Sequence, residues 1–241
     1  MTATTAPLTT TPTSPGTSTG PVIAASRRTS IGWRAGAVAL VVGAGLNTAQ
    51  AALGQVLGER PEDVADQITL ANERTGLVGT MVLVGTFAIP FMAVGFLAAA
   101  QELRRRAPRT AYVAASFLLL GMWGFLAMHV AEVLQLVAML DPRGGDAATW
   151  MGGLESEPLL GILFAFPFMI GCVVGMLTLS IGMLVTGVVP RWIPALFLVF
   201  ILLDFSIGAV GPVDPHWLYF AGALGLATHI VRNRPSARAV A

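Results

Sequence analysis

Long apolar segments separated by short polar loops make up most of this chain. A helix needs about 20 mostly apolar residues to cross a hydrocarbon core of about 30 Å. Backbone groups in lipid must pair within the chain, as they do in a helix, and strand-like alternation is missing from these segments. The pattern predicts an all-α fold, a polytopic transmembrane helical bundle with six spans. The six apolar segments are residues 33–57, 76–100, 110–140, 158–187, 193–211 and 216–232.

The ends of the chain have a different composition from these segments. Residues 1–30 are rich in Thr, Ser and Pro and lack the apolar core of a signal peptide, so we expect a disordered cytoplasmic tail. Residues 31–232 form the predicted transmembrane domain. Residues 233–241 form a short basic tail.

The placement of arginine predicts how the helices are threaded. All 14 basic residues are Arg, and 11 of them flank the predicted spans on the side that holds both termini. Arg60, Arg74 and Arg143 lie on the other side, together with ten acidic residues. Because cytoplasmic loops carry an excess of basic residues, we expect both termini to be cytoplasmic. The basic residues are all Arg rather than Lys, and Ala and Gly are abundant. This composition suggests a bacterial protein, which we expect in the plasma membrane.

Composition narrows the possible classes of protein. The chain is 55% hydrophobic and only 11% charged, whereas soluble domains carry about 25% charged residues. A net charge of +1 gives no electrostatic reason to expect a nucleic-acid partner. Cys172, the one cysteine, excludes a disulfide within the chain and is expected to serve packing. We expect no cofactor.

The first loop on the acidic side has a helical pattern. Pro61, followed by two acidic residues, suits the start of a helix. Val64, Ile68 and Ala71 fall on one helical face. The pattern predicts a short helix, which serves either as a lid over a pocket or as the capped start of the second span.

Polar residues inside the apolar segments are the strongest functional signal. Each ionisable residue at the centre of a span costs about 2.5–3.5 kcal/mol, so such residues usually face protein or a cavity. At about 1.5 Å per residue, Asn47 and Asp204 fall near the midplane, and His129 and Glu132 fall in the outer third. Together with Gln50, these residues predict a polar cavity that faces outward.

The spacing on the third span predicts which of its faces is buried. His129 and Glu132 are three residues apart, so they are neighbours on one helical face. Gly121 and Gly124 lie on the same side as Glu132, and small residues allow helices to approach closely. We therefore expect this face to point into the bundle.

Three functional hypotheses remain open. The first is an integral membrane protein whose cavity binds or transports a small solute, a lipid or a proton. The second is a structural or regulatory subunit that acts through a protein partner or as a homo-oligomer. The third is an intramembrane metal-dependent enzyme, with His129, Glu132 and His216 as candidate ligands. No nucleophile motif supports catalysis, and the Glu-x-x-His order of di-iron helix bundles is reversed.

One hairpin carries a family resemblance. The stretch GMLTLSIGMLVTGVVPRWIPALFLVFILLDF contains a Thr186-Gly187 turn, a Pro190-Arg191 pair and Asp204 late in its second helix. In these features it resembles a group of uncharacterised actinobacterial six-helix membrane proteins. The resemblance implies the same topology and no particular activity.

Overall fold

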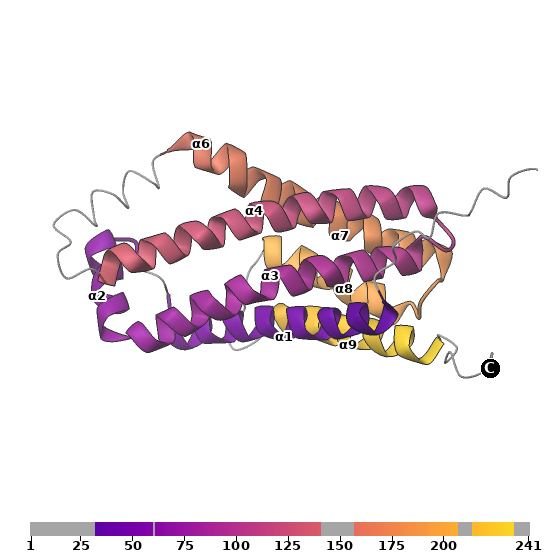
Figure 1. Cartoon of the computed structure of the whole chain (residues 1–241), viewed down its shortest axis with the longest axis horizontal. Helices are drawn as coiled ribbons and strands as arrows, with labels where there is room; N and C mark the ends of the chain where they lie inside the picture. The colour runs from indigo at the N-terminus through magenta and orange to yellow at the C-terminus, as the bar shows by residue number, and fades with distance from the viewer. Residues whose placement is uncertain (1–31, 60, 141–156, 207–213, 234–241) are drawn as a thin grey trace, which may run out of the picture. The chain divides into compact units, whose positions relative to one another are not determined.

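The computed structural model describes residues 32–59, 61–140, 157–206 and 214–233, and these residues form helices and no strands. The all-α prediction is confirmed for this part of the chain. The predicted N-terminal tail, and all but Asn233 of the predicted C-terminal tail, lie outside the described residues. The elements, drawn in Figure 1, are α1 (Trp33–Leu57), α2 (Val64–Glu73), α3 (Thr75–Leu103), α4 (Pro108–Leu140), α6 (Pro158–Leu160), the π turn η1 (Gly161–Ala165), α7 (Phe166–Thr186), α8 (Trp192–Ser206) and α9 (His216–Asn233).

Four helices are long and apolar enough to cross a membrane: α1, α3, α4 and the continuous helix Pro158–Thr186 that contains α6, η1 and α7. The chain therefore has the apolar helices of a membrane-embedded protein. The described part of α8 is a shorter apolar helix of 15 residues. The rest of the predicted segment 193–211 lies outside the described residues. The last helix, α9, carries more polar residues, among them His229, Arg232 and Asn233.

Six helices pack in a closed ring. In order around the ring, α1 contacts α3, α3 contacts α4, α4 contacts α7, α7 contacts α8, α8 contacts α9, and α9 returns to α1. Figure 1 shows these helices running side by side, with α2 at the end where α1 stops and α3 begins. This arrangement gives the ring an interior that is lined from all sides.

Glycines bring neighbouring ring helices into backbone contact. A Cβ atom on Gly171 of α7 would meet the backbone of Gly121 on α4. A Cβ atom on Gly43 of α1 would lie 2.6 Å from the backbone nitrogen of Met92 on α3. Gly121 and Gly124 are both buried, so the predicted interior face of the third span is confirmed. Close backbone approach at small residues stabilises helix pairs in lipid, where apolar burial alone does not.

The short helix α2 is confirmed, with a later start than expected. The Asp63 carboxylate accepts a hydrogen bond of 2.7 Å from the backbone N–H of Ala65 and so caps the first turn. This cap places Pro61 before the helix rather than at its first position. Arg74 separates α2 from α3, so the two helices are distinct.

Candidate functional site

A cavity of about 270 Å³ lies where the ends of α1, α3 and α4 meet α2, and we call it the α2 cavity. Its polar lining comes from Glu132 and Gln135 of α4 and from Gln67 of α2. The amide of Asn72 donates a hydrogen bond of 3.3 Å to the carbonyl of Met139, which joins α2 to the end of α4. The short helix is therefore both a capped helix and part of the cavity wall. The apolar lining includes Leu57, Val78, Met81, Val82, Leu136 and Met139.

His129 lies beneath this cavity and is almost fully buried, with 2% of its surface exposed. Its Nδ1 atom is 3.1 Å from the carbonyl oxygen of Phe125, and its Nε2 atom is 2.9 Å from the amide nitrogen of Gln50. In the tautomer with its proton on Nδ1, the ring donates to the Phe125 carbonyl and accepts from the Gln50 amide.

Glu132 connects His129 to the α2 cavity. One of its carboxylate oxygens lies 3.8 Å from His129 Nε2, and 36% of its side chain is exposed. At 3.8 Å the two groups are too far apart for a direct hydrogen bond. Among the described residues, no arginine lies within ion-pair distance of Glu132. Its carboxylate therefore lacks a cationic partner in this part of the chain.

A second, smaller cavity of about 60 Å³ lies in the centre of the ring, and we call it the central cavity. All six ring helices contribute to its wall. Most of the lining is aromatic or aliphatic, and the polar exceptions are Asn47, Asp204, His216 and Tyr219. About 10–15 Å³ of such space holds one water molecule, so this cavity has room for several.

Asn47 is the most deeply buried amide at the central cavity. Only 5% of its surface is exposed, and its side chain makes no hydrogen bond with any described residue. Buried polar groups are nearly always paired, with protein or with ordered water. Because Asn47 lines a cavity with room for water, we expect water to satisfy its amide.

The two cavities are separated by a polar layer. On α4, Glu132 lines the α2 cavity, Phe125 lines the central cavity, and His129 lies between them. Gln50 has the same intermediate position on α1, and Gly85 has it on α3. A Cβ atom on Gly85 would overlap the side chain of Gln50, so the amide is held between α3 and His129. The contact between Gln50 and His129 therefore lies between the residues that line the two cavities.

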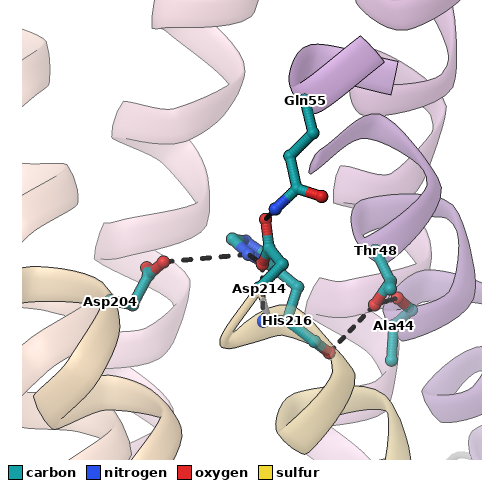
Figure 2. A network of polar contacts seen from close by, with 6 residues as sticks. All are labelled: Ala44, Thr48, Gln55, Asp204, Asp214 and His216. Atoms are coloured by element: carbon teal, nitrogen blue, oxygen red, sulfur yellow. Dashed lines mark hydrogen bonds and ion pairs between the residues drawn. The ribbon is translucent and has the colours of Figure 1, made fainter. Parts of the chain in front are cut away.

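A second polar network joins α1, α8 and the start of α9 (Figure 2). The carboxylate of Asp214 accepts hydrogen bonds from the His216 backbone N–H at 2.8 Å and from the Gln55 amide at 3.2 Å. The same carboxylate lies 2.7 Å from Nδ1 of His216, and Asp204 approaches that nitrogen at 3.7 Å. Thr48 Oγ1 lies 3.0 Å from the carbonyl oxygen of His216. This network anchors the beginning of α9 to α1.

The structure thus divides the five predicted cavity residues into two groups. Glu132 lines the α2 cavity, and Gln50 and His129 contact each other between the helix levels of the two cavities. The other two, Asn47 and Asp204, line the central cavity.

The sequence reasoning missed Gln55 and Asp214 as members of a polar network. Asp214 precedes Pro215 at the start of α9, which is the residue order of an N-cap, and that signal was available in the sequence.

The candidate metal ligands do not come together. His129 and Glu132 are neighbours, but His216 belongs to the network of Asp214. Within the ranges that the structure describes, no three His, Cys, Asp or Glu side chains are grouped so as to hold a metal ion. Among the described residues that line the α2 cavity, Glu132 is the one ionisable side chain.

Comparison of the chain with protein-family models, with curated proteins and with solved structures gives no match.

Proposed function

We propose that this chain is a six-span protein of a bacterial plasma membrane, with both termini in the cytoplasm, and that it binds a small ligand in the α2 cavity from the outer side. One observation carries the proposal. A cavity of about 270 Å³ is enclosed by the ends of three long apolar helices and covered by α2. Ligand pockets are concave, mostly apolar and equipped with a few polar groups, and the α2 cavity has all three properties.

The ring supports six spans. Each ring helix contacts a neighbour on both sides, and α8 and α9 close the ring between α7 and α1. The apolar sequence after α8 continues to residue 211, which gives that span the length it needs. With six spans, the arginine-rich loops all fall on the side of the termini, as the positive-inside rule requires.

The length of α4 supports a position of the α2 cavity at the outer boundary of the membrane. Helix α4 has 33 residues and is about 50 Å long, which exceeds the hydrocarbon thickness by about 20 Å. If Arg109 marks the cytoplasmic boundary, about 30 Å of helix ends near His129. Glu132 and Gln135 then lie at the level of the lipid headgroups, and α2 lies outside, so a ligand reaches the cavity from the outer aqueous phase.

The interior of the helix ring favours binding of a ligand over its transport across the membrane. The contact between Gln50 and His129 lies between the helix levels of the α2 cavity and the central cavity. At the end of the ring opposite α2, the interior is packed with apolar side chains that are at most 1% exposed. These include Leu103, Met183, Ile193 and Leu226. This packing supports a closed binding pocket rather than a continuous polar route.

A cavity-filling substitution tests the proposal. A Cβ atom on Gly54 would lie 3.7 Å from the Met81 sulfur, so Gly54→Leu is accommodated on α1 and fills the α2 cavity. Gly79→Leu is the matched control, because a Cβ atom at Gly79 meets nothing within 4 Å and Gly79 does not line the cavity. The purified proteins are screened against a small-solute library by thermal shift.

We expect ligands that stabilise the wild type to stabilise Gly79→Leu equally and to lose their effect on Gly54→Leu. If every stabilising ligand acts equally on both variants, the α2 cavity is not the binding site. If no solute stabilises the wild type, a structural or partner-dependent role replaces ligand binding.

A further inference from the structure

We infer that the α2 cavity selects small organic cations, in which an ammonium group is carried on a compact apolar body. This inference rests on the proposed function, because it names the class of ligand for the same cavity. Four features of the described residues support it: the charge of the lining, the exposure of the Glu132 carboxylate, the apolar wall and the surface around the entrance.

The lining of the α2 cavity carries one ionisable group. Among its described lining residues, Glu132 is the one that bears a charge, and no basic residue joins it. A carboxylate beside apolar walls attracts a cation more strongly than it does in bulk water, because the effective dielectric constant is lower. The same charge repels anionic solutes.

The Glu132 carboxylate is accessible to a ligand, because 36% of its side chain is exposed. Among the described residues, no arginine pairs with it, and the nearest ring nitrogen, Nε2 of His129, lies 3.8 Å away and contacts the Gln50 amide at 2.9 Å.

The rest of the wall suits an apolar body of limited size. Met81 and Met139 supply flexible, polarisable side chains that adapt to irregular shapes, and Val78, Val82 and Leu136 complete that surface. A volume of about 270 Å³ is just below the range of about 300–1,000 Å³ that is typical of drug-sized ligands. A small ammonium compound fits this space.

The surface next to the cavity attracts the same class of ligand. Five exposed acidic residues lie on α2 and on the segment leading into it. One exposed described arginine, Arg74, follows Glu73 at the end of α2, so negative charge is in excess there. An excess of surface charge of one sign raises the local concentration of oppositely charged solutes and their association rate. The exposed acids are Glu59, Glu62, Asp63, Asp66 and Glu73.

A pair of isosteric probes separates charge from shape. Choline and 3,3-dimethylbutan-1-ol have the same shape and differ in whether the centre that bears the three methyl groups is a cationic nitrogen or a neutral carbon. Their binding to the wild-type protein in lipid nanodiscs is measured by calorimetry, with tetraethylammonium and benzyltrimethylammonium as larger cations.

The variants are Glu132→Gln, Glu132→Asp and Glu62→Gln. Glu62 is exposed and does not line the cavity, so Glu62→Gln is the control for the loss of one carboxylate. All variants must keep the wild-type elution volume and melting temperature before binding is compared.

We expect at least one of the three cations to bind, and choline to bind more tightly than its neutral isostere. We expect Glu132→Gln to weaken cation binding by about tenfold, which corresponds to about 1.4 kcal/mol. The affinity for the neutral isostere should not change in Glu132→Gln. Glu132→Asp should retain the preference for cations. Glu62→Gln should change the affinity by less than about twofold, as for other exposed charges.

Three results would overturn the inference: no saturable binding of any cation, equal binding of choline and its isostere, or an unchanged affinity in Glu132→Gln. The Gly54→Leu variant shows which proposal has failed. If neutral solutes bind the wild type and are lost in Gly54→Leu, the cavity binds ligands but does not select cations. If Gly54→Leu has no effect on any ligand, the proposed function fails as well.

Discussion

Gln50 and His129 are joined by a hydrogen bond of 2.9 Å between two nitrogen atoms, the amide Nε2 and the ring Nε2. This contact connects α1 to α4 and lies between the α2 cavity and the central cavity. It holds the buried His129 ring in place beside Glu132, whose carboxylate lies 3.8 Å from the same ring nitrogen.

Replacing Gln50 by Leu should destabilise the fold. The substitution leaves Nε2 of the buried imidazole without a donor, and interhelical hydrogen bonds in membrane proteins contribute about 0.6 kcal/mol on average, with larger costs for unpaired buried groups. We expect a loss of about 1 kcal/mol in the free energy of unfolding, measured by denaturant titration in detergent. Gln135→Leu is the control, since Gln135 has no hydrogen bond with a described residue. An equal loss in both variants would contradict the role given to Gln50.

Gly85 should be coupled to Gln50. A methyl group at Gly85 overlaps the Gln50 side chain, so Gly85→Ala displaces the amide from His129. We expect Gly85→Ala to cost about 1–3 kcal/mol in the wild-type background, as overpacking typically does. In a Gln50→Ala background, which removes the overlapping amide, the cost should largely disappear. A double-mutant cycle on the free energy of unfolding measures this coupling, and strict additivity would show that the two residues do not interact.

Asp214 should stabilise the start of α9. Its carboxylate accepts from the backbone of His216 and from Gln55, so Asp214→Ala removes an N-cap and a contact between helices. Caps of this kind contribute about 0.5–2 kcal/mol. We expect Asp214→Ala to lower the melting temperature and to increase hydrogen exchange in the first turn of α9. The control is Asp66→Ala, because Asp66 is an exposed acid in the first turn of α2. Hydrogen exchange in the first turn of α9 that is equally slow in both variants would argue against a cap by Asp214.

Cysteine labelling tests the threading through the membrane. In a Cys172→Ala background, Glu73→Cys at the end of α2 should react with a membrane-impermeant maleimide added to intact cells. Arg105→Cys, which follows α3, should react only after the cells are opened. Both positions are exposed, so a failure to react reflects sidedness. The reverse pattern would place the termini outside and would remove the outward access proposed for the α2 cavity.

Much of the fold was predictable from the sequence because hydropathy determines where apolar helices begin and end. The expected segment 33–57 coincides with α1, and the expected 110–140 differs from α4 only at its first turn. The short helix α2 was predicted from Pro61 and the acids after it, although the cap on Asp63 moved its start to Val64.

Contacts between helices were not predictable in the same way. Asn47 and Gln50 are three residues apart on α1, yet Asn47 lines the central cavity and Gln50 contacts His129 in the layer above. Which of the two residues meets α4 depends on the order of the helices in the ring and on their axial offset. Neither the order nor the offset can be read from a single sequence. Asp214 is one of the ten acidic residues predicted on the outer side, yet only 6% of it is exposed because the start of α9 packs against α1.

The most direct test of cation binding in the α2 cavity is an experimental structure in lipid nanodiscs at a saturating concentration of benzyltrimethylammonium. We expect ligand density in the α2 cavity, with the ammonium group beside the Glu132 carboxylate and the ring against Met81 and Met139. Density for the cation elsewhere, or an α2 cavity filled by side chains in the presence of the ligand, would contradict this expectation.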